Sequence, residues 1–179
     1  MPGEGEIEVV KIIGALLIML ATTWTGFDAS RRLTERTRQL RLFKNALLSL
    51  EAEIMYGHTP LHEASRRLAR QLPEPLSSFF SAFANKLVNT ETTVKQAWDD
   101  CLQSLEKRAA FKQGELEIMR QFGETLGRHD KTSQQKHIQL TITHLEREEA
   151  DATEKQQKYG KMVKSLGFLS GLLIVILLI

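Results

Sequence analysis

The residues that decide the fold are 31–54, which read RRLTERTRQLRLFKNALLSLEAEI. In this stretch an apolar side chain returns every seven residues and others stand between; they are Leu33, Leu40, Leu47 and Ile54, with Phe43 and Leu50. Since seven residues make about two turns of an α-helix, these side chains line one face. The stretch therefore predicts a helix that packs against other helices along this seam.

Downstream, the same kind of spacing predicts about five further helices. Their apolar residues run over 61–72, 76–87, 94–105, 111–126 and from about 130 onward. Thr59 followed by Pro60 predicts the start of the first of these, with threonine as N-cap and proline at the first helical position. Gly127 is predicted to end the helix over 111–126, and Asp130 to cap the last one.

No segment shows the alternating pattern of β-strands with turn dipeptides. The predicted fold is therefore all-α, an antiparallel bundle of about six helices joined by short links. The first and last helices are expected to lie side by side, because each continues into an apolar end of the chain.

Apolar segments open and close the chain, at 9–27 and 165–179. The first leaves through Trp24 and Phe27, which are placed as interfacial anchors would be. We predict that both are transmembrane helices. At about 1.5 Å per residue, residues 166–179 reach only about 21 Å of a hydrocarbon core of roughly 30 Å. Met162 and Val163 extend the segment if Lys164 snorkels to the headgroups.

The alternatives are a cleaved signal peptide at the start and a buried core helix at the end. A signal peptide needs a basic leader, whereas residues 1–8 carry three acids. A terminal core helix alternates polar and apolar faces, whereas Leu172 to Ile179 is apolar all round. The sequence favours the membrane interpretation at both ends.

These features divide the chain into an extra N-terminal tail (1–8), a membrane helix (9–27), a central domain (28–164) and a second membrane helix (165–179). Basic residues flank the domain at both membrane borders; they are Arg31, Arg32, Arg36, Arg38, Arg41 and Lys44 on one side and Lys155, Lys158, Lys161 and Lys164 on the other. Because positive charge marks the cytoplasmic side, the domain is predicted to be cytoplasmic and both termini to lie across the membrane.

The composition narrows the class of protein. Without Lys11 and the three acids of residues 1–8, 23 of the 24 basic and 19 of the 22 acidic residues remain, so the central domain has a net charge of +4. This charge is too mild for a nucleic-acid-binding protein. The single cysteine, Cys101, rules out an internal disulfide and agrees with a reducing compartment. Residues 146–158 carry mixed charge, and two interpretations stay open: a solvated stalk helix or an exposed face of the bundle.

Four residue pairs could suggest metal chemistry; they are His58 and His62, His137 and His144, Glu51 and Glu53, and Asp99 and Asp100. His58 and His62 are four apart, a spacing that puts two imidazoles on one helix face for a metal, but Thr59 and Pro60 stand between them at a predicted helix start. The other pairs match no recognised ligand pattern, and no glycine-rich loop could hold a phosphate. Cys101 lies on an apolar helix face, where a thiol is protonated and inert. We therefore expect no enzyme, no cofactor and no metal.

Gly123, Glu124, Thr125 and Gly127 gather near the predicted end of the fifth helix. A glycine inside a helix costs about 1 kcal/mol relative to alanine, so it needs a reason. One reason is the close approach of a neighbouring helix at Gly123 with termination at Gly127; the other is a surface that accepts a partner. Both interpretations stay open.

Four strings carry a family resemblance; they are 21–27 (ATTWTGF), 49–61 (SLEAEIMYGHTPL), 121–127 (QFGETLG) and 144–149 (HLEREE). They closely resemble the stage III sporulation protein AB family of endospore-forming bacteria. The likeness runs from about Val10 to Ile179, and residues 1–8 look like an extension.

More distantly, the chain is similar to one cytoplasmic domain of the platform proteins of type II secretion and type IV pilus machines. Two groups of residues carry this likeness: Gly57, Pro60, Leu61 and Ala64 at one helix start, and Gly123, Glu124, Thr125 and Gly127 at one helix end. The resemblance implies that these residues support the fold or contact a partner.

The family resemblance implies a non-enzymatic platform of the secretion-like channel complex between mother cell and forespore, in the mother-cell membrane around the forespore. The implied partners are a cytoplasmic secretion-type ATPase of the same operon, other membrane proteins of the stage III complex and the lipid bilayer, with no nucleic acid. Two other functions stay open: a membrane-surface adaptor that binds anionic lipid through residues 31–44, and a metal-dependent membrane hydrolase that uses His58 and His62 with Glu51 or Glu63.

Overall fold

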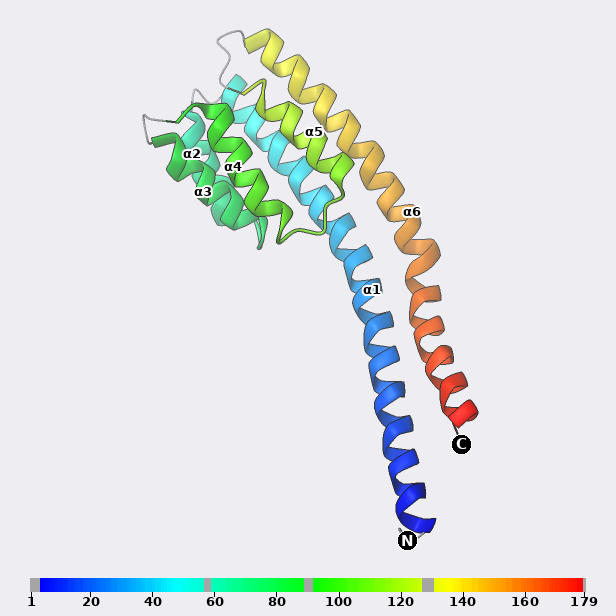
Figure 1. The fold of residues 1–179 in the computed structure, drawn as a ribbon. Helices are drawn as coiled ribbons and strands as arrows, with labels where there is room; N and C mark the ends of the chain where they lie inside the picture. The colour runs from blue at the N-terminus through cyan, green and yellow to red at the C-terminus, as the bar shows by residue number, and fades with distance from the viewer. Residues whose placement is uncertain (1–3, 57–58, 89–91, 127–130, 179) are drawn as a thin grey trace. The chain divides into compact units, whose positions relative to one another are not determined.

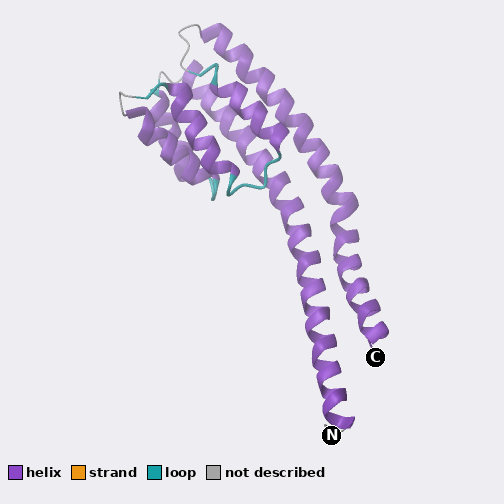
Figure 2. Ribbon diagram, in the orientation of Figure 1, coloured by secondary structure: helices purple, strands orange, loops and turns teal. Residues whose placement is uncertain are grey.

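The computed structural model describes residues 4–56, 59–88, 92–126 and 131–178 (Figure 1). All regular structure within these ranges is helical (Figure 2). The helices are α1 (Glu4–Met55), α2 (Leu61–Gln71), α3 (Leu76–Val88), α4 (Val94–Glu106), α5 (Gln113–Gly123) and α6 (Lys131–Leu178). The prediction of an all-α fold is confirmed.

The chain forms two compact units. The bundle unit is Arg36–Ala152, and the terminal unit combines Met1–Glu35 with Thr153–Ile179. The long helices α1 and α6 contribute residues to both units, whereas α2 to α5 belong to the bundle unit alone.

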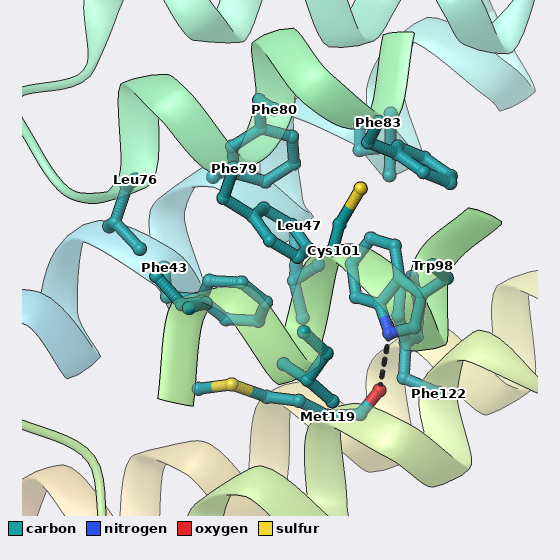
Figure 3. Packing of buried hydrophobic residues seen from close by; sticks show 14 of the residues in the cluster. Phe43, Leu47, Leu76, Phe79, Phe80, Phe83, Trp98, Cys101, Met119 and Phe122 are labelled. Atoms are coloured by element: carbon teal, nitrogen blue, oxygen red, sulfur yellow. Dashed lines mark hydrogen bonds between the residues drawn. The ribbon is translucent and has the colours of Figure 1, made fainter. Parts of the chain in front are cut away.

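The core of the bundle unit is built around Trp98 of α4, which is completely buried (Figure 3). Its indole makes edge-to-face contacts with four phenylalanines; the centroid distances are 4.9 Å to Phe79, 5.1 Å to Phe83, 5.2 Å to Phe122 and 6.2 Å to Phe43. Such aromatic pairs stabilise a fold by roughly 0.5–1.5 kcal/mol each beyond the area that they bury. The predicted seam of α1 meets this core through buried residues at Leu40, Phe43, Leu47 and Leu50.

The start of α2 differs from the prediction. Pro60 has φ −57° and ψ 142°, so it stands outside the helix as its N-cap, and Leu61 is the first helical residue. The predicted cap, Thr59, donates its hydroxyl proton to Glu53 Oε2 at 2.6 Å. The prediction of a Thr59 cap is wrong because this hydroxyl bonds to a side chain of α1 instead of the first turn of α2.

The end of α5 also differs. The sequence predicted a helix that runs to Gly127, but α5 ends at Gly123, and Glu124 is its C-cap. Turn hydrogen bonds follow from Thr125 N to Phe122 O (3.0 Å) and from Leu126 N to Gly123 O (3.3 Å). Gly127 and Asp130, the predicted end of this helix and cap of the next, lie outside the described residues.

The acidic stretch of α6 contacts α1 within the bundle unit. Glu149 Oε1 lies 2.8 Å from Arg41 Nε, and Glu149 Oε2 lies 2.9 Å from Lys44 Nζ. Ala152, three residues on, is buried in the core. As far as Ala152 the mixed-charge segment is a face of the bundle, as the second interpretation expected, but it is only partly exposed because Glu149 and Ala152 pack against the rest of the unit.

In the terminal unit, Ser30 of α1 donates a hydrogen bond to the carbonyl of Gly160 in α6 at 3.2 Å. Large apolar side chains on both segments are exposed; they are Ile13, Leu17, Leu20, Trp24 and Phe27 on α1, and Met162, Leu166, Phe168, Leu169, Leu172, Leu173 and Ile176 on α6. Over the residues that the structure describes, neither helix has a stretch both long and apolar enough to cross a membrane.

Candidate functional site

The two residue groups that resemble platform proteins lie at the same end of the bundle unit. α1 and α5 finish there and α2 begins there (Figure 1). We call this region the motif end and define it by Thr59, Pro60, Leu61, Ala64 and Gly123 to Thr125. Two predicted members, Gly57 and Gly127, lie outside the described residues, as does His58.

Gly123 is buried because it touches the indole of Trp98. A Cβ at this position would overlap Trp98, with the ring atoms Cγ and Nε1 each only 2.8 Å away and Cδ1 closer still. The indole cannot easily retreat, since its Nε1 donates a hydrogen bond to the carbonyl of Met119 at 2.8 Å (Figure 3). Of the two interpretations of this glycine, the close approach of a neighbouring helix is the one that the structure shows.

Glu124 and Thr125, the next two residues, have different roles. The Thr125 hydroxyl donates to the carbonyl of Phe122 at 2.8 Å and so satisfies a group at the end of α5. The Glu124 side chain is 54% exposed and accepts a hydrogen bond from Lys95 Nζ at 3.0 Å. This hydrogen bond raises the pKa of Lys95. Exposed pairs of this kind contribute little to stability, so the Glu124 carboxylate is accessible to a partner.

At the start of α2, Ala64 is buried and Leu61 is half-buried against the core. Beside them a groove of about 470 Å³ lies between the end of α1 and α2; its lining is Ser49, Leu50, Ala52, Glu53, Tyr56, Ala64, Arg67, Leu68 and Gln71. Tyr56 is 77% exposed at the groove. The Thr59 hydroxyl, together with Arg67, lowers the pKa of Glu53 below its usual 4.5. Sequence reasoning missed Tyr56, whose exposure depends on where α1 ends.

The six basic residues predicted beside the membrane are of three kinds: exposed, paired with Glu149, or, for Arg36, buried. Arg31 and Arg38 are exposed, and the exposed Arg32 pairs with Asp28 at 3.0 Å. Arg41 and Lys44 pair with Glu149 across the bundle unit. Burial would raise the pKa of Glu149, but hydrogen bonds from Lys44 and Arg41 outweigh burial and lower it.

Arg36 is buried in an ion cluster. Its Nε donates to Glu115 Oε1 at 2.7 Å, and its Nη2 lies 3.2 Å from Glu148 and 3.5 Å from Asp151. Glu115, which is fully buried, also accepts the backbone N–H of Lys112 at 2.6 Å and so fixes the start of α5. Arg36 is therefore not available to anionic lipid, contrary to the expectation for the basic group.

The residue pairs considered for metal chemistry do not converge. Among the described residues, no three His, Cys, Asp or Glu side chains are grouped as metal ligands would be. His137 and His144 are exposed on α6, and His62 is half-buried on α2. Glu51 is buried and accepts hydrogen bonds from the amide of Gln139 at 2.6 and 2.8 Å.

Cys101 is expected to react slowly with alkylating reagents in the folded chain. It is 3% exposed, and burial raises its pKa from 9.0 to about 11. Because thiolate is the reactive form, its fraction at neutral pH falls roughly 100-fold. Mass spectrometry of iodoacetamide labelling, in buffer and in denaturant at the same pH, measures the difference. Equal rates in both would contradict the packing of α3 against α4.

Known proteins match most of the chain. A family model described as Stage III sporulation protein AB matches residues 11–179. The chain is 54% identical over 170 residues to Stage III sporulation protein AB of Bacillus subtilis (strain 168), and the match covers 95% of this chain and 99% of that protein. A solved structure of Stage III sporulation protein AB superposes with a TM-score of 0.67 at 52% identity, covering 69% of this chain and 98% of the other.

Proposed function

The chain belongs to the stage III sporulation protein AB family, and from this premise we propose that it is a non-enzymatic platform of a secretion-like complex between mother cell and forespore. In this role it couples a cytoplasmic ATPase of the same operon to the membrane proteins of the stage III complex. The family makes it a component of sporulation; the platform role is our proposal and is supported by the arrangement of the motif end.

The proposal places the terminal unit in the mother-cell membrane around the forespore, with the bundle unit in the cytoplasm. Its support is the row of exposed apolar side chains on both segments of that unit. A contiguous exposed apolar surface of this kind is typical of proteins whose partner is a membrane or another protein. The basic residues Arg31, Arg32 and Lys158 favour the cytoplasmic side for the bundle unit.

The proposal places the ATPase contact at the motif end. The main support for this contact is that two adjacent motif residues differ in burial. Gly123 is buried and packs against Trp98, whereas Glu124 is exposed and contributes little to packing. The groove with Tyr56 on its rim lies at the same end and adds an aromatic contact. Aromatic side chains are enriched among the residues that dominate binding energy in protein interfaces.

Co-purification of the full-length chain in detergent with the ATPase of the same operon tests the coupling. We expect Glu124→Ala to weaken the association by about tenfold, the effect of removing one charged contact of moderate strength. The fold is expected to remain, because the ion pair that Glu124 forms among the described residues is with the exposed Lys95.

Glu117→Ala is the matched control. Glu117 lies on α5, the helix that Glu124 caps. Its side chain is also 54% exposed, and it also pairs with a basic residue, Arg120, at 2.6 Å. We expect this variant to bind as the unaltered chain does. Equal loss in both variants would refute the motif end as the contact, and failure of the unaltered chain to recover the ATPase would refute the coupling. If Glu124→Ala unfolds the chain, the residue is structural.

A further inference from the structure

On α1 of the terminal unit, one row of exposed side chains, which we call the stripe, changes from aliphatic to aromatic to basic along the helix. Leu20, Trp24, Phe27 and Arg31 follow one another at spacings of four, three and four residues, so they share one helix face. All four are exposed, and Trp24 is 78% exposed. Together with Thr23 and Asp28 they line a shallow concavity of about 410 Å³. The stripe therefore passes from aliphatic through aromatic to cationic along one surface.

The second helix of the terminal unit shows the same order at the same level. The hydrogen bond from Ser30 to Gly160 aligns the two segments, which brings Lys158 and Tyr159 of α6 level with Arg31 of α1. Beyond this level α6 presents exposed Met162, Leu166 and Leu169. Aromatic residues collect where hydrocarbon meets headgroups, and basic residues collect among the headgroups. Both helices thus carry aromatic and basic residues near one level, and on α6 the basic residues continue to Lys164 before the charge-free run 165–179 begins.

At this level Arg31 provides a positive charge that can bind an anionic ligand. Asp28, the acid in the concavity, is paired with Arg32 at 3.0 Å. Among the described acids, none forms an ion pair with Arg31, whose side chain is exposed. A guanidinium presents a fork of N–H donors that matches two oxygens of a phosphate. The concavity thus combines the guanidinium of Arg31, which no described acid pairs with, and an apolar surface formed by Leu20, Trp24 and Phe27.

We propose that this stripe binds one anionic phospholipid, with Arg31 on the headgroup phosphate and with Trp24, Phe27 and Leu20 against the glycerol and upper acyl chains. The inference rests on the proposed membrane placement of the terminal unit. It goes further, because it names the lipid class, a single site and the residue that selects for charge.

Fluorescence of Trp24 in vesicles tests the site. The chain has two tryptophans, and Trp98 is completely buried, so the difference between the unaltered chain and Trp24→Phe reports Trp24. The full-length chain is reconstituted into phosphatidylcholine vesicles that contain a minor fraction of brominated phosphatidylglycerol or, separately, the same fraction of brominated phosphatidylcholine. We expect the anionic lipid to occupy the quenching position about fivefold more often, which corresponds to about 1 kcal/mol for one basic residue at an anionic surface.

Three variants distinguish a specific site from non-specific attraction between the basic helix and anionic lipid. Arg31→Gln is expected to abolish the preference for phosphatidylglycerol. Arg38→Gln, which removes the same charge from an exposed position two turns further along α1, is expected to keep it. Arg31→Lys retains the charge and is expected to retain most of the preference. Equal loss in Arg31→Gln and Arg38→Gln would overturn the site.

The remaining outcomes distinguish failure of the site from failure of the membrane proposal. If both brominated lipids quench Trp24 equally in the unaltered chain, the site is wrong while the membrane placement stands. If neither lipid quenches Trp24, the membrane placement itself is wrong. Inorganic phosphate, added at constant ionic strength, is expected to leave the preference unchanged; if it removes the preference, the ligand is free phosphate and the lipid assignment is overturned.

Discussion

Replacing Arg36 with methionine is expected to lower the free energy of unfolding of the full chain by about 3–5 kcal/mol, the usual effect of leaving a buried charge without its partner. Glu115 is fully buried, and its carboxylate bonds only to Arg36 and to the N–H of Lys112 in the contacts described above. Without Arg36 the carboxylate keeps one hydrogen bond in an apolar setting. Urea unfolding of the full chain in detergent, followed by near-ultraviolet circular dichroism, measures the change.

The double variant Arg36→Met with Glu115→Met is the control that separates charge from packing. Two methionines fill similar space without charge, so we expect at least half of the lost stability to return. Arg36 Nη1 is buried without a hydrogen-bond partner among the described residues, which lowers the net value of the original pair. A double variant that is less stable than both single variants would show that the ion cluster is itself a major source of stability.

Gly123→Ala is expected to destabilise the chain by about 2–3 kcal/mol, and Gly123→Leu by more, because overpacking a close-packed core forces neighbouring groups to move. The new Cβ would overlap the indole of Trp98. Moving that ring breaks its hydrogen bond to Met119 and disturbs its contacts with Phe79, Phe83 and Phe122. Denaturant unfolding measures the loss, and a red shift of Trp98 emission would report the displaced ring.

Gly114→Ala is the matched control on the same helix. A Cβ at Gly114 meets nothing within 4 Å, so only the helix propensity changes. That change is expected to stabilise α5 by about 0.5–1 kcal/mol. The opposite signs at the two glycines test whether contact with Trp98, and not glycine content, sets the requirement at position 123. A neutral Gly123→Ala would refute the close approach.

The sequence was sufficient to predict the helices of the bundle unit, because their apolar residues recur at a period that one helix face explains. The buried positions Leu40, Leu47 and Leu102 were all on predicted apolar faces. Helix ends were harder to predict, since Thr59 and Gly127 have favourable chemistry for caps, yet the Thr59 hydroxyl bonds to Glu53. A cap competes with tertiary hydrogen bonds, which a local pattern does not contain.

Ion pairs in the bundle unit were beyond sequence reasoning. Arg36 and Glu115 are 79 residues apart, and neither differs locally from an exposed charged residue. The one local signal was the position of Glu115 three residues after Lys112, where a glutamate often accepts the N-cap N–H. For the candidate site, the sequence located Gly123 and Glu124 but left their roles open. That Gly123 is buried and Glu124 is exposed became evident only from the structure, which shows Trp98 against Gly123.

The ion pairs between α1 and α6 can form only after both helices have been synthesised, so the bundle unit cannot finish folding earlier. Arg36 and Glu148 are 112 residues apart, so a ribosome delivers α1 long before its partner acids. Contacts of such long sequence separation form late and slow the folding of a domain. Until α6 emerges, the buried cluster of the bundle unit lacks Ile138, Ile142 and Leu145. A chain released early would therefore be a target for proteolysis, not a smaller working domain.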